Sequence, residues 1–386
     1  MYSVNGSTGA ILASVRTATK CARGAKVIVS RAVHKSVYHA LELCGVVPYY
    51  IAPRLATAGF CTSVTSEEVS YALEKCPDAS LVIVTSPTYE GVISDIRGIA
   101  SVCHEHGVPL MVDEAHGAHL GLYDIFPDGA VKCGADIVVQ SFHKTLPSLT
   151  QTAAVHQQGT LVNANELGRQ MAIFQTSSPS YILSASIDGA VRYLASDEGK
   201  ERLEEWYVAV TETRNRLQIT AKLKLYTGDE NVFQLDKSKL VILGDGFGIM
   251  KALREEYNIE LEMASVGYAV AMTGAGDVAE SLDRFASAVE SIGEVPFASE
   301  IYKGNIHIPK AAYLISDAVC MKRETVSLKN AAGRVSASYI YAYPPGIPLV
   351  VPGEVIDFEV VTEIEGLAKA GASVRGIKHG KIMILK

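Results

Sequence analysis

The 386-residue sequence lacks three features that would direct it to a membrane, an oxidising compartment or a polyanion. It contains no run of about 18 apolar residues, which argues against a membrane-spanning helix. Its seven cysteines are scattered, odd in number and without a CxxC pair, a usage typical of reduced thiols in a cytoplasmic protein. It has no excess of basic residues, since the net charge is −7, so neither nucleic acid nor an anionic membrane is expected as a partner.

Acidic residues are absent from the first 41 positions, which carry several arginines and lysines. This composition superficially resembles a transit peptide. The same stretch also has the pattern of folded protein, because a Gly/Ser/Thr turn precedes a helical segment and an apolar strand at 26–30. We therefore favour a structural interpretation over a targeting segment.

Short apolar runs alternate with helical patterns through the first half of the chain. Strands are expected at 26–30, 47–51, 81–85, 110–113 and 136–140, and helices at 34–44, 66–75 and 96–106. Such alternation with strands apolar on both faces predicts an α/β fold with a mostly parallel sheet covered by helices.

A long charged helix at 201–217 leads out of this large domain, which we place at 1–217. A smaller α/β domain is expected at 218–297, with a strand at 239–243 and helices at 250–257 and 277–292. A third domain follows at 298–386. It contains the Pro/Gly-rich stretch 343–354 and a terminal strand pair around 372–385.

Three polar segments stand where the predicted strands and helices meet. The strand PLMVD delivers Asp113, and the next strand delivers the loop SFHKT with Lys144. A lysine can form a Schiff base with an aldehyde cofactor, and a carboxylate can hold a pyridine nitrogen protonated. Near the start, Asn5–Gly9 opens a helix whose N–H groups and hydroxyls would suit a phosphate.

Each of these signals is weak when taken alone. A strand-terminal aspartate is often a helix cap, a loop lysine is usually solvated, and a Gly-Ser-Thr turn is common punctuation. His116 and His119 could suggest a metal. Neither HExxH nor a Cys/His ligand set is present, so no metal is expected. The order of the segments and their places at strand ends give the combination its weight.

The combination resembles the ornithine/lysine/arginine decarboxylase family of fold-type-I pyridoxal-phosphate enzymes. The resemblance spans nearly the whole chain, and the segments that carry it are VNGSTGAILA, SRAVHKSVYHAL, VTSPTYEGV, VDEAHGAH, QSFHKTLPSLTQTA, TSSPSYILSASID and YPPGIPLVVPGE. It implies a large domain of the aspartate-aminotransferase type, a small α/β domain and a family-specific C-terminal domain.

The resemblance also implies a role for individual residues. Lys144 would be the Schiff-base lysine and Asp113 the partner of the pyridine nitrogen of pyridoxal 5'-phosphate. The remaining implied cofactor contacts are the ring-stacking His34, the ring-packing Ala115 and His116, the phosphate-side Ser7, Thr8, Ser141 and His143, and Thr176, which would reach the phosphate of a neighbouring subunit. Glu354 is the implied candidate on the substrate side. His34 could equally be a partly buried helix residue, and Thr176 an ordinary turn residue.

The implied reaction is decarboxylation of arginine, lysine or ornithine to the corresponding amine, with His143 or Lys144 as the proton donor. A homodimer or higher homo-oligomer is implied as well. Family members normally carry a segment ahead of the NGST motif, including a PGHxxG-type stretch. This sequence starts almost at that motif, so part of the substrate pocket is expected to be missing. The alternatives are another fold-type-I enzyme, such as an aminotransferase or side-chain lyase, and a cofactor-binding subunit without catalysis.

Overall fold

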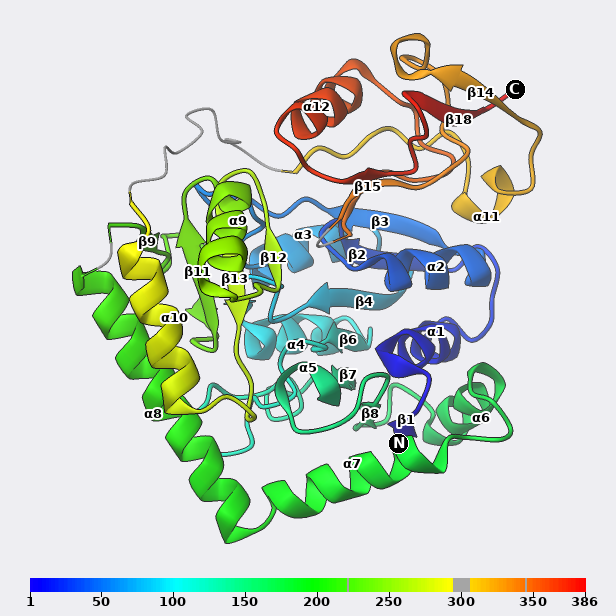
Figure 1. Ribbon diagram of the computed structural model, residues 1–386. Helices are drawn as coiled ribbons and strands as arrows, with labels where there is room; N and C mark the ends of the chain where they lie inside the picture. Colours follow the sequence, from blue (N-terminus) through cyan, green and yellow to red (C-terminus); the bar gives the residue numbers. More distant parts are fainter. Residues whose placement is uncertain (221, 294–305, 344–345) are drawn as a thin grey trace.

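The computed structural model describes residues 1–220, 222–293, 306–343 and 346–386. Its main feature is a seven-stranded sheet in the order β1-β8-β7-β6-β4-β2-β3 (Figure 1). The strands β2, β3, β4, β6 and β7 run parallel, and β8 joins them antiparallel. The bounds of the strands are β1 Tyr2–Ser3, β2 Lys26–Ser30, β3 Val47–Ile51, β4 Ala79–Thr85, β6 Leu110–Asp113, β7 Ile137–Ser141 and β8 Ala153–Gln157. The predicted mostly parallel sheet is confirmed.

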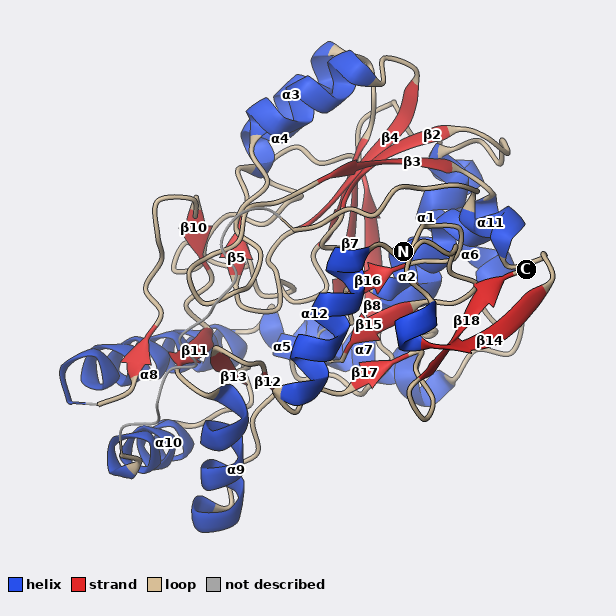
Figure 2. Ribbon diagram, turned by 90° about the horizontal axis from the view of Figure 1, so that it is seen from above, coloured by secondary structure: helices blue, strands red, loops and turns tan. Residues whose placement is uncertain are grey.

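Helices cover both faces of this sheet because alternate strand residues are apolar on each side. Val27 and Val29 of β2 pack towards α1, α2 and α6, whereas Ile28 packs towards α3 and α4. Figure 2 shows these two helix layers on opposite sides of the twisted strands. The helices are α1 Gly6–Ala18, α2 Lys35–Cys44, α3 Ser66–Lys75, α4 Ile96–Glu105, α5 Phe142–Thr145 and α6 Ala164–Phe174. Because the central strands run parallel, their polar carboxyl ends lie at one edge of the sheet.

Two long helices connect this unit to a smaller one. Helix α7 spans Tyr181–Leu194 and α8 spans Asp197–Thr220, longer at both ends than predicted. The smaller unit has an antiparallel sheet in the order β12-β13-β11-β9, beside α9 and α10 (Figure 1). Its elements are β9 Lys224–Leu225, β11 Lys239–Leu243, α9 Gly246–Tyr257, β12 Met263–Ala264, β13 Tyr268–Met272 and α10 Ala279–Ser291. The pair β5 (Val92–Ile93) and β10 (Gln234–Leu235) joins the smaller unit to the loop after β4.

The C-terminal region forms two small sheets with α12 packed against them. The elements are α11 Ile315–Ala318, β14 Arg323–Ser327, the 3-10 helix Leu328–Asn330, β15 Ile340–Ala342, β16 Pro348–Val350, α12 Phe358–Lys369, β17 Val374–Arg375 and β18 Lys381–Leu385. The predicted terminal pair is wrong in its partners, because β17 pairs with β15 and β18 pairs with β14. The predicted domain boundary at 297/298 and the prolines at 344 and 345 lie outside the described residues. In the described ranges, no helix is both long enough and apolar enough to cross a membrane.

Candidate active site

The carboxyl ends of three neighbouring strands bring Thr85, Asp113 and Ser141 to one edge of the large sheet. Thr85 of β4 lies opposite Asp113 of β6, and Asp113 lies opposite Val139 of β7, two residues before Ser141. Ligands of open α/β sheets bind beyond these strand ends. The register therefore gathers at one edge the polar residues that the sequence placed at separate strand ends.

Lys144 follows Ser141 on the single turn of α5, which directs its amine back over the sheet edge. Lys144 Nζ lies 2.8 Å from His116 Nε2 and 5.7 Å from the centroid of the Tyr89 ring. Burial lowers the pKa of Lys144, against the opposing charges of Asp113 and Glu262. A lowered pKa increases the neutral, nucleophilic fraction of a lysine. The residue singled out from the sequence is thus a partly buried amine suited to covalent chemistry.

Asp113 is almost completely buried, and its charge interacts with that of the Lys144 amine. Burial raises the pKa of Asp113, while the charge of Lys144 and a hydrogen bond from the Ala115 amide act to lower it. The Ala115 amide donates to Asp113 Oδ1 at 3.2 Å. Asp113 can therefore serve as the acceptor for a protonated ring nitrogen, with Ala115 fixing its orientation.

His116 lies between Lys144 and Tyr89. The His116 and Tyr89 rings have centroids 4.1 Å apart and are tilted by 49°. Burial, together with the charges of Lys144 and Lys239, lowers the pKa of His116 well below its usual value, so the ring is neutral. His116 Nδ1 is buried without a hydrogen-bond partner in the described part of the chain. Tyr89 was not predicted from the sequence, although it lies in the segment VTSPTYEGV, and only its ring contact identifies it.

His34 ends the loop after β2 and caps α2. Its Nδ1 accepts a hydrogen bond from the Ser36 amide at 3.2 Å, so the ring is fixed by its own helix. Burial and then the charge of Lys144 lower the pKa of His34 to about 4. His34 is thus close enough to Lys144 to be affected by its charge, and its ring is neutral. Both the stacking role and the local capping role fit this position.

The start of α1 provides the features of an anion site at the same edge. Asn5, the residue before the helix, makes no side-chain capping bond, and its Nδ2 donates instead to the Phe174 carbonyl. The first amides of a helix have no partner within the helix. Ser7 and Thr8 therefore present amides and hydroxyls at an uncapped positive helix end. Strand pairing aligns Ser3, just ahead of this turn, with Ala153 and then Ser141.

Ser141 and His143 complete this side of the site. Ser141 Oγ is fully buried, yet within the described ranges it has no hydrogen-bond partner. His143 donates through Nδ1 to the Thr152 carbonyl at 3.2 Å, which leaves Nε2 free to act. Burial lowers the pKa of His143. An uncapped helix end beside an orphaned buried hydroxyl fits a phosphate group.

Two predicted site residues have other partners. Thr176 is exposed on the loop between α6 and α7, where its hydroxyl accepts from the Ser178 amide. Glu354 is buried, and its two oxygens accept from Arg31 at 2.7 and 2.9 Å and from the Val351 amide at 2.9 Å. Both carboxylate oxygens of Glu354 are therefore used in joining the C-terminal region to the end of β2. The structure favours a structural role for Glu354 over the expected substrate contact.

The chain is similar to known proteins along its whole length. The Orn/Lys/Arg decarboxylase major domain matches residues 1–241, and the C-terminal domain of that family matches residues 303–374. The arginine decarboxylase of Bacillus subtilis is 34% identical over 400 residues, covering 100% of this chain and 81% of that protein. The arginine decarboxylase of Bacillus anthracis is 32% identical over 401 residues, covering 100% of this chain and 80% of that protein.

A solved structure shares the fold. The lysine decarboxylase of Francisella novicida matches with a TM-score of 0.85 at 19% identity, over 100% of this chain and 69% of that chain. This likeness confirms the predicted fold class, and the match of both family domains confirms the resemblance seen in the motifs. The chain belongs to the Orn/Lys/Arg decarboxylase family.

Proposed function

We propose that the protein is a pyridoxal-phosphate-dependent decarboxylase of a basic amino acid, with Lys144 as its reactive lysine. The observation that carries the proposal is the partly buried Lys144 amine, which lies 2.8 Å from His116 Nε2 and interacts through its charge with the buried carboxylate of Asp113. Membership of the family and the names of the arginine decarboxylases among its relatives support the same reaction.

The residues present fit pyridoxal 5'-phosphate. Ser7, Thr8 and Ser141 would hold the phosphate, Asp113 the ring nitrogen, and His34 and His116 the two ring faces. When bound, the cofactor supplies an aldehyde for a Schiff base and a ring that accepts electrons from the substrate. The orphaned Ser141 Oγ and His116 Nδ1 are the buried polar atoms that such a ligand would approach.

The protein's own groups have separate tasks in this reaction. Asp113, oriented by Ala115, stabilises a positive charge at the sheet edge. The neutral rings of His34 and His116 enclose the Lys144 amine and exclude water, which strengthens the interaction between that amine and Asp113. A proton can be returned from Lys144 Nζ or from His143 Nε2, since the Nδ1 atom of His143 is bonded to Thr152.

We propose arginine, lysine and ornithine as the substrates to be tested, with arginine first because of the two Bacillus relatives. A basic side chain calls for an acidic partner. The carboxylate of Glu262 is exposed on the small unit and acts on both Lys144 and Tyr89. Glu262 is therefore a better candidate for this contact than the paired Glu354.

We also propose a homodimer in which Thr176 reaches the neighbouring subunit. Thr176 is exposed, and the nearby apolar residues Tyr181 and Ile182 at the start of α7 are 83% and 73% exposed. A subunit interface would cover these side chains. All seven cysteines are free, which supports the proposed cytoplasmic location.

The experiment is a substrate panel on the purified protein with added pyridoxal phosphate. Release of CO2 together with agmatine, cadaverine or putrescine is expected from one of the three amino acids. Lys144→Ala should abolish both turnover and the visible absorbance of the bound cofactor. Formation of a keto acid without CO2 would instead identify an aminotransferase. Cofactor absorbance without any turnover would identify a binding subunit, and either result would overturn the proposal.

A further inference from the structure

Lys239 is a buried lysine that takes no part in the proposed reaction, and it contacts the site through His116. Lys239 is the first residue of β11, and its side chain is fully buried. Lys239 Nζ donates to Asp236 Oδ2 at 3.0 Å, to Ser238 Oγ at 3.0 Å and to the His116 carbonyl at 3.2 Å. A buried ammonium is expensive unless it is paired and hydrogen-bonded, and here three acceptors surround it.

The third of these hydrogen bonds connects Lys239 to His116, which also contacts the Lys144 amine. The His116 main chain accepts from Lys239, and the His116 ring meets Lys144 Nζ at 2.8 Å. His116 thus connects two lysines that come from different units of the protein. The orientation of the His116 ring depends on where its main chain is held.

Asp236, the charged partner of Lys239, is itself held in place by hydrogen bonds. Asp236 Oδ1 accepts from the Ser238 amide at 3.0 Å and lies 3.1 Å from His119 Nε2, whose ring packs against Trp206. Although burial acts to raise it, the charges of Lys239 and His119 hold the pKa of Asp236 below its usual range. Asp236 is therefore an ionised anchor for Lys239.

The loop after β4 packs closely against Asp236 and Lys239. Gly91 has a φ of +89°, and a Cβ atom there would lie 2.9 Å from the Asp236 carbonyl oxygen and 2.9 Å from Lys239 Cγ. The Asp236 amide donates to the Gly91 carbonyl at 2.8 Å. Tyr89, two residues earlier, is the residue whose ring packs on His116. Both contacts of His116 are thus set by segments that rest on Lys239 and Asp236.

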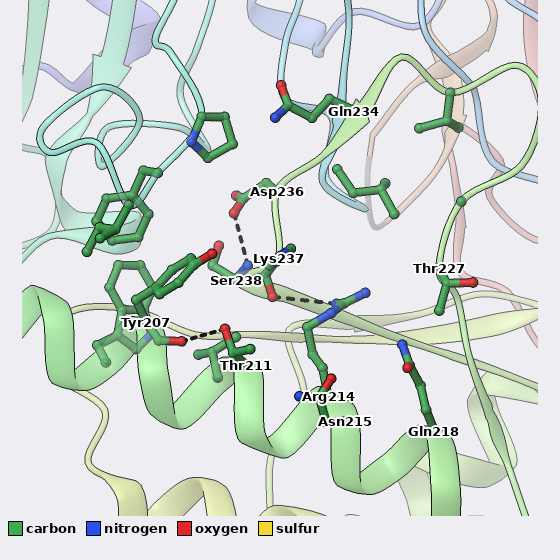
Figure 3. Close-up of a pocket in the computed structure, with 18 of the residues that line it drawn as sticks. Tyr207, Thr211, Arg214, Asn215, Gln218, Thr227, Gln234, Asp236, Lys237 and Ser238 are labelled. Carbon is green, nitrogen blue, oxygen red and sulfur yellow. Dashed lines mark hydrogen bonds between the residues drawn. The ribbon is translucent and has the colours of Figure 1, made fainter.

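A cavity of about 790 Å³ lies on the far side of the turn that carries Asp236. Figure 3 shows Asp236 and Ser238 at the wall of this cavity, with Arg214 and Tyr207 projecting from α8. The Arg214 guanidinium donates to the Lys239 carbonyl at 2.9 Å, so the backbone of Lys239 is held as well as its side chain.

We propose that Lys239 is a positioning residue for Lys144: held by Asp236, it fixes the His116 main chain so that the His116 ring meets the Lys144 amine. The proposal rests on the proposed function in so far as Lys144 is the reactive lysine. Lys239 also acts on the amine through space, because its charge adds to burial in lowering the pKa of Lys144. The variants below keep the other charged or titratable groups that interact with Lys144, namely Asp113, Glu262, His34, His116, His143 and Tyr89.

The first experiment measures the Lys144 amine in the cofactor-free protein. Competitive labelling with acetic anhydride, followed by peptide mass mapping, gives the pKa of Lys144 without relying on activity. Lys239→Met removes a positive charge and should raise that pKa by about half a unit to one unit. Asp236→Asn should shift it the opposite way, and the double variant should return it close to the original value. Opposite shifts distinguish positioning and charge from general loss of stability.

The matched control is Lys26→Met. Lys26 is also the first residue of a strand and lies 2.9 Å from an aspartate, Asp78, but both side chains are largely exposed. Its removal should leave the pKa of Lys144 unchanged. If Lys239→Met is too unstable to purify, Asp236→Asn carries the test, because it should shift the pKa of Lys144 in the opposite direction. An unchanged pKa of Lys144 in Lys239→Met, or in Asp236→Asn where that variant replaces it, would overturn the proposal.

The second experiment uses the cofactor-loaded protein. Lys239→Met should lower kcat by about 100-fold, because a small displacement of the reacting group has effects of that size, while KM changes by less than about threefold. Lys239→Arg keeps the charge and the donors and should restore part of kcat. A large rise in KM with kcat preserved would contradict the positioning role. If labelling shifts as expected but no amino acid is decarboxylated, the proposed function fails and the positioning of Lys144 stands.

Discussion

Two buried polar regions of the protein differ in how many of their polar atoms form hydrogen bonds. At the joint between Arg31 and Glu354, both oxygens of the carboxylate accept hydrogen bonds. At the edge around Lys144, the hydroxyls of Thr85 and Ser141 and the Nδ1 atom of His116 have no partner among the described residues. Buried polar atoms are normally satisfied. The Glu354 carboxylate is therefore structural, although Arg31 Nε beside it also has no partner among the described residues. The edge around Lys144, where three such atoms gather, indicates where a ligand binds.

The largest effect is expected when the ion pair between Arg31 and Glu354 is broken. Arg31→Met leaves the Glu354 carboxylate buried without its partner and should lower the free energy of unfolding by roughly 3–5 kcal/mol. The double variant Arg31→Met/Glu354→Leu should recover most of that loss. Urea unfolding of the cofactor-free protein measures both. A large increase in KM in the refolded double variant would show that Glu354 contacts substrate after all.

Asp113→Asn tests the region around Lys144, where activity should be affected much more than stability. It removes a buried charge whose pKa burial already raises, so the cofactor-free protein should be at least as stable as the original. Loss of the charge opposite the ring should lower kcat by about 10²–10³-fold, or roughly 2.7–4 kcal/mol of barrier. Steady-state kinetics and unfolding on the same sample give both numbers. A loss of stability with kcat preserved would make Asp113 a structural residue.

Ser141→Ala examines a single orphaned hydroxyl. Because Ser141 Oγ has no partner in the described structure, its removal should not destabilise the cofactor-free protein. Cofactor binding should weaken about tenfold, or roughly 1.4 kcal/mol, which a fluorescence titration with pyridoxal phosphate measures.

The matched control for Ser141 is Ser63. Ser63 Oγ is buried but paired, since it donates to the Ile93 carbonyl at 2.8 Å and accepts from the Phe233 amide at 3.0 Å. Ser63→Ala should therefore cost about 1 kcal/mol of stability and leave cofactor affinity unchanged. Identical behaviour of the two alanine variants would remove the distinction between paired and unpaired regions.

The smallest effect is a pH dependence at Glu114, next to Asp113 but turned away from Lys144. Burial raises the pKa of Glu114 to about 8, although the Ala130 amide and the Gln140 amide group donate to its oxygens. The folded protein thus binds this proton more tightly than the unfolded chain does. The contribution to stability is full below the unfolded pKa and is lost as pH rises through 8, by roughly 1 kcal/mol between pH 7 and pH 9. Glu114→Gln should flatten this slope in unfolding curves measured across that range.

The sequence was sufficient for those parts of the fold that are decided locally. The predicted strands at 26–30, 47–51 and 110–113 coincide with β2, β3 and β6, because short apolar runs between polar segments mark strands. Strands β2 and β6 are buried on both faces, whereas the edge strand β3 is only partly buried. The strand before Ser141 is shifted by one residue, and β4 begins two residues earlier than predicted. Strand partners depend on contacts distant in sequence, which is why β17 and β18 were paired with each other in error.

The same limit applies to the site. Lys144 and Asp113 could be predicted because each follows an apolar strand and matches a family motif. Tyr89 and Lys239 could not, since their importance comes from a ring contact and a carbonyl contact with His116. Glu354 shows the converse: a motif drew attention to it, and only the structure shows Arg31 as its partner.

The short strand pair β5–β10 has a mechanical consequence. It ties the segment ahead of Lys239 to the loop that carries Tyr89 and Gly91, and Gly91 leaves no space between them. A rotation of the smaller sheet must therefore either carry that loop with it or break the Gly91–Asp236 hydrogen bond. Because Lys239 and Tyr89 both contact His116, such a movement would also change the contact between His116 and Lys144.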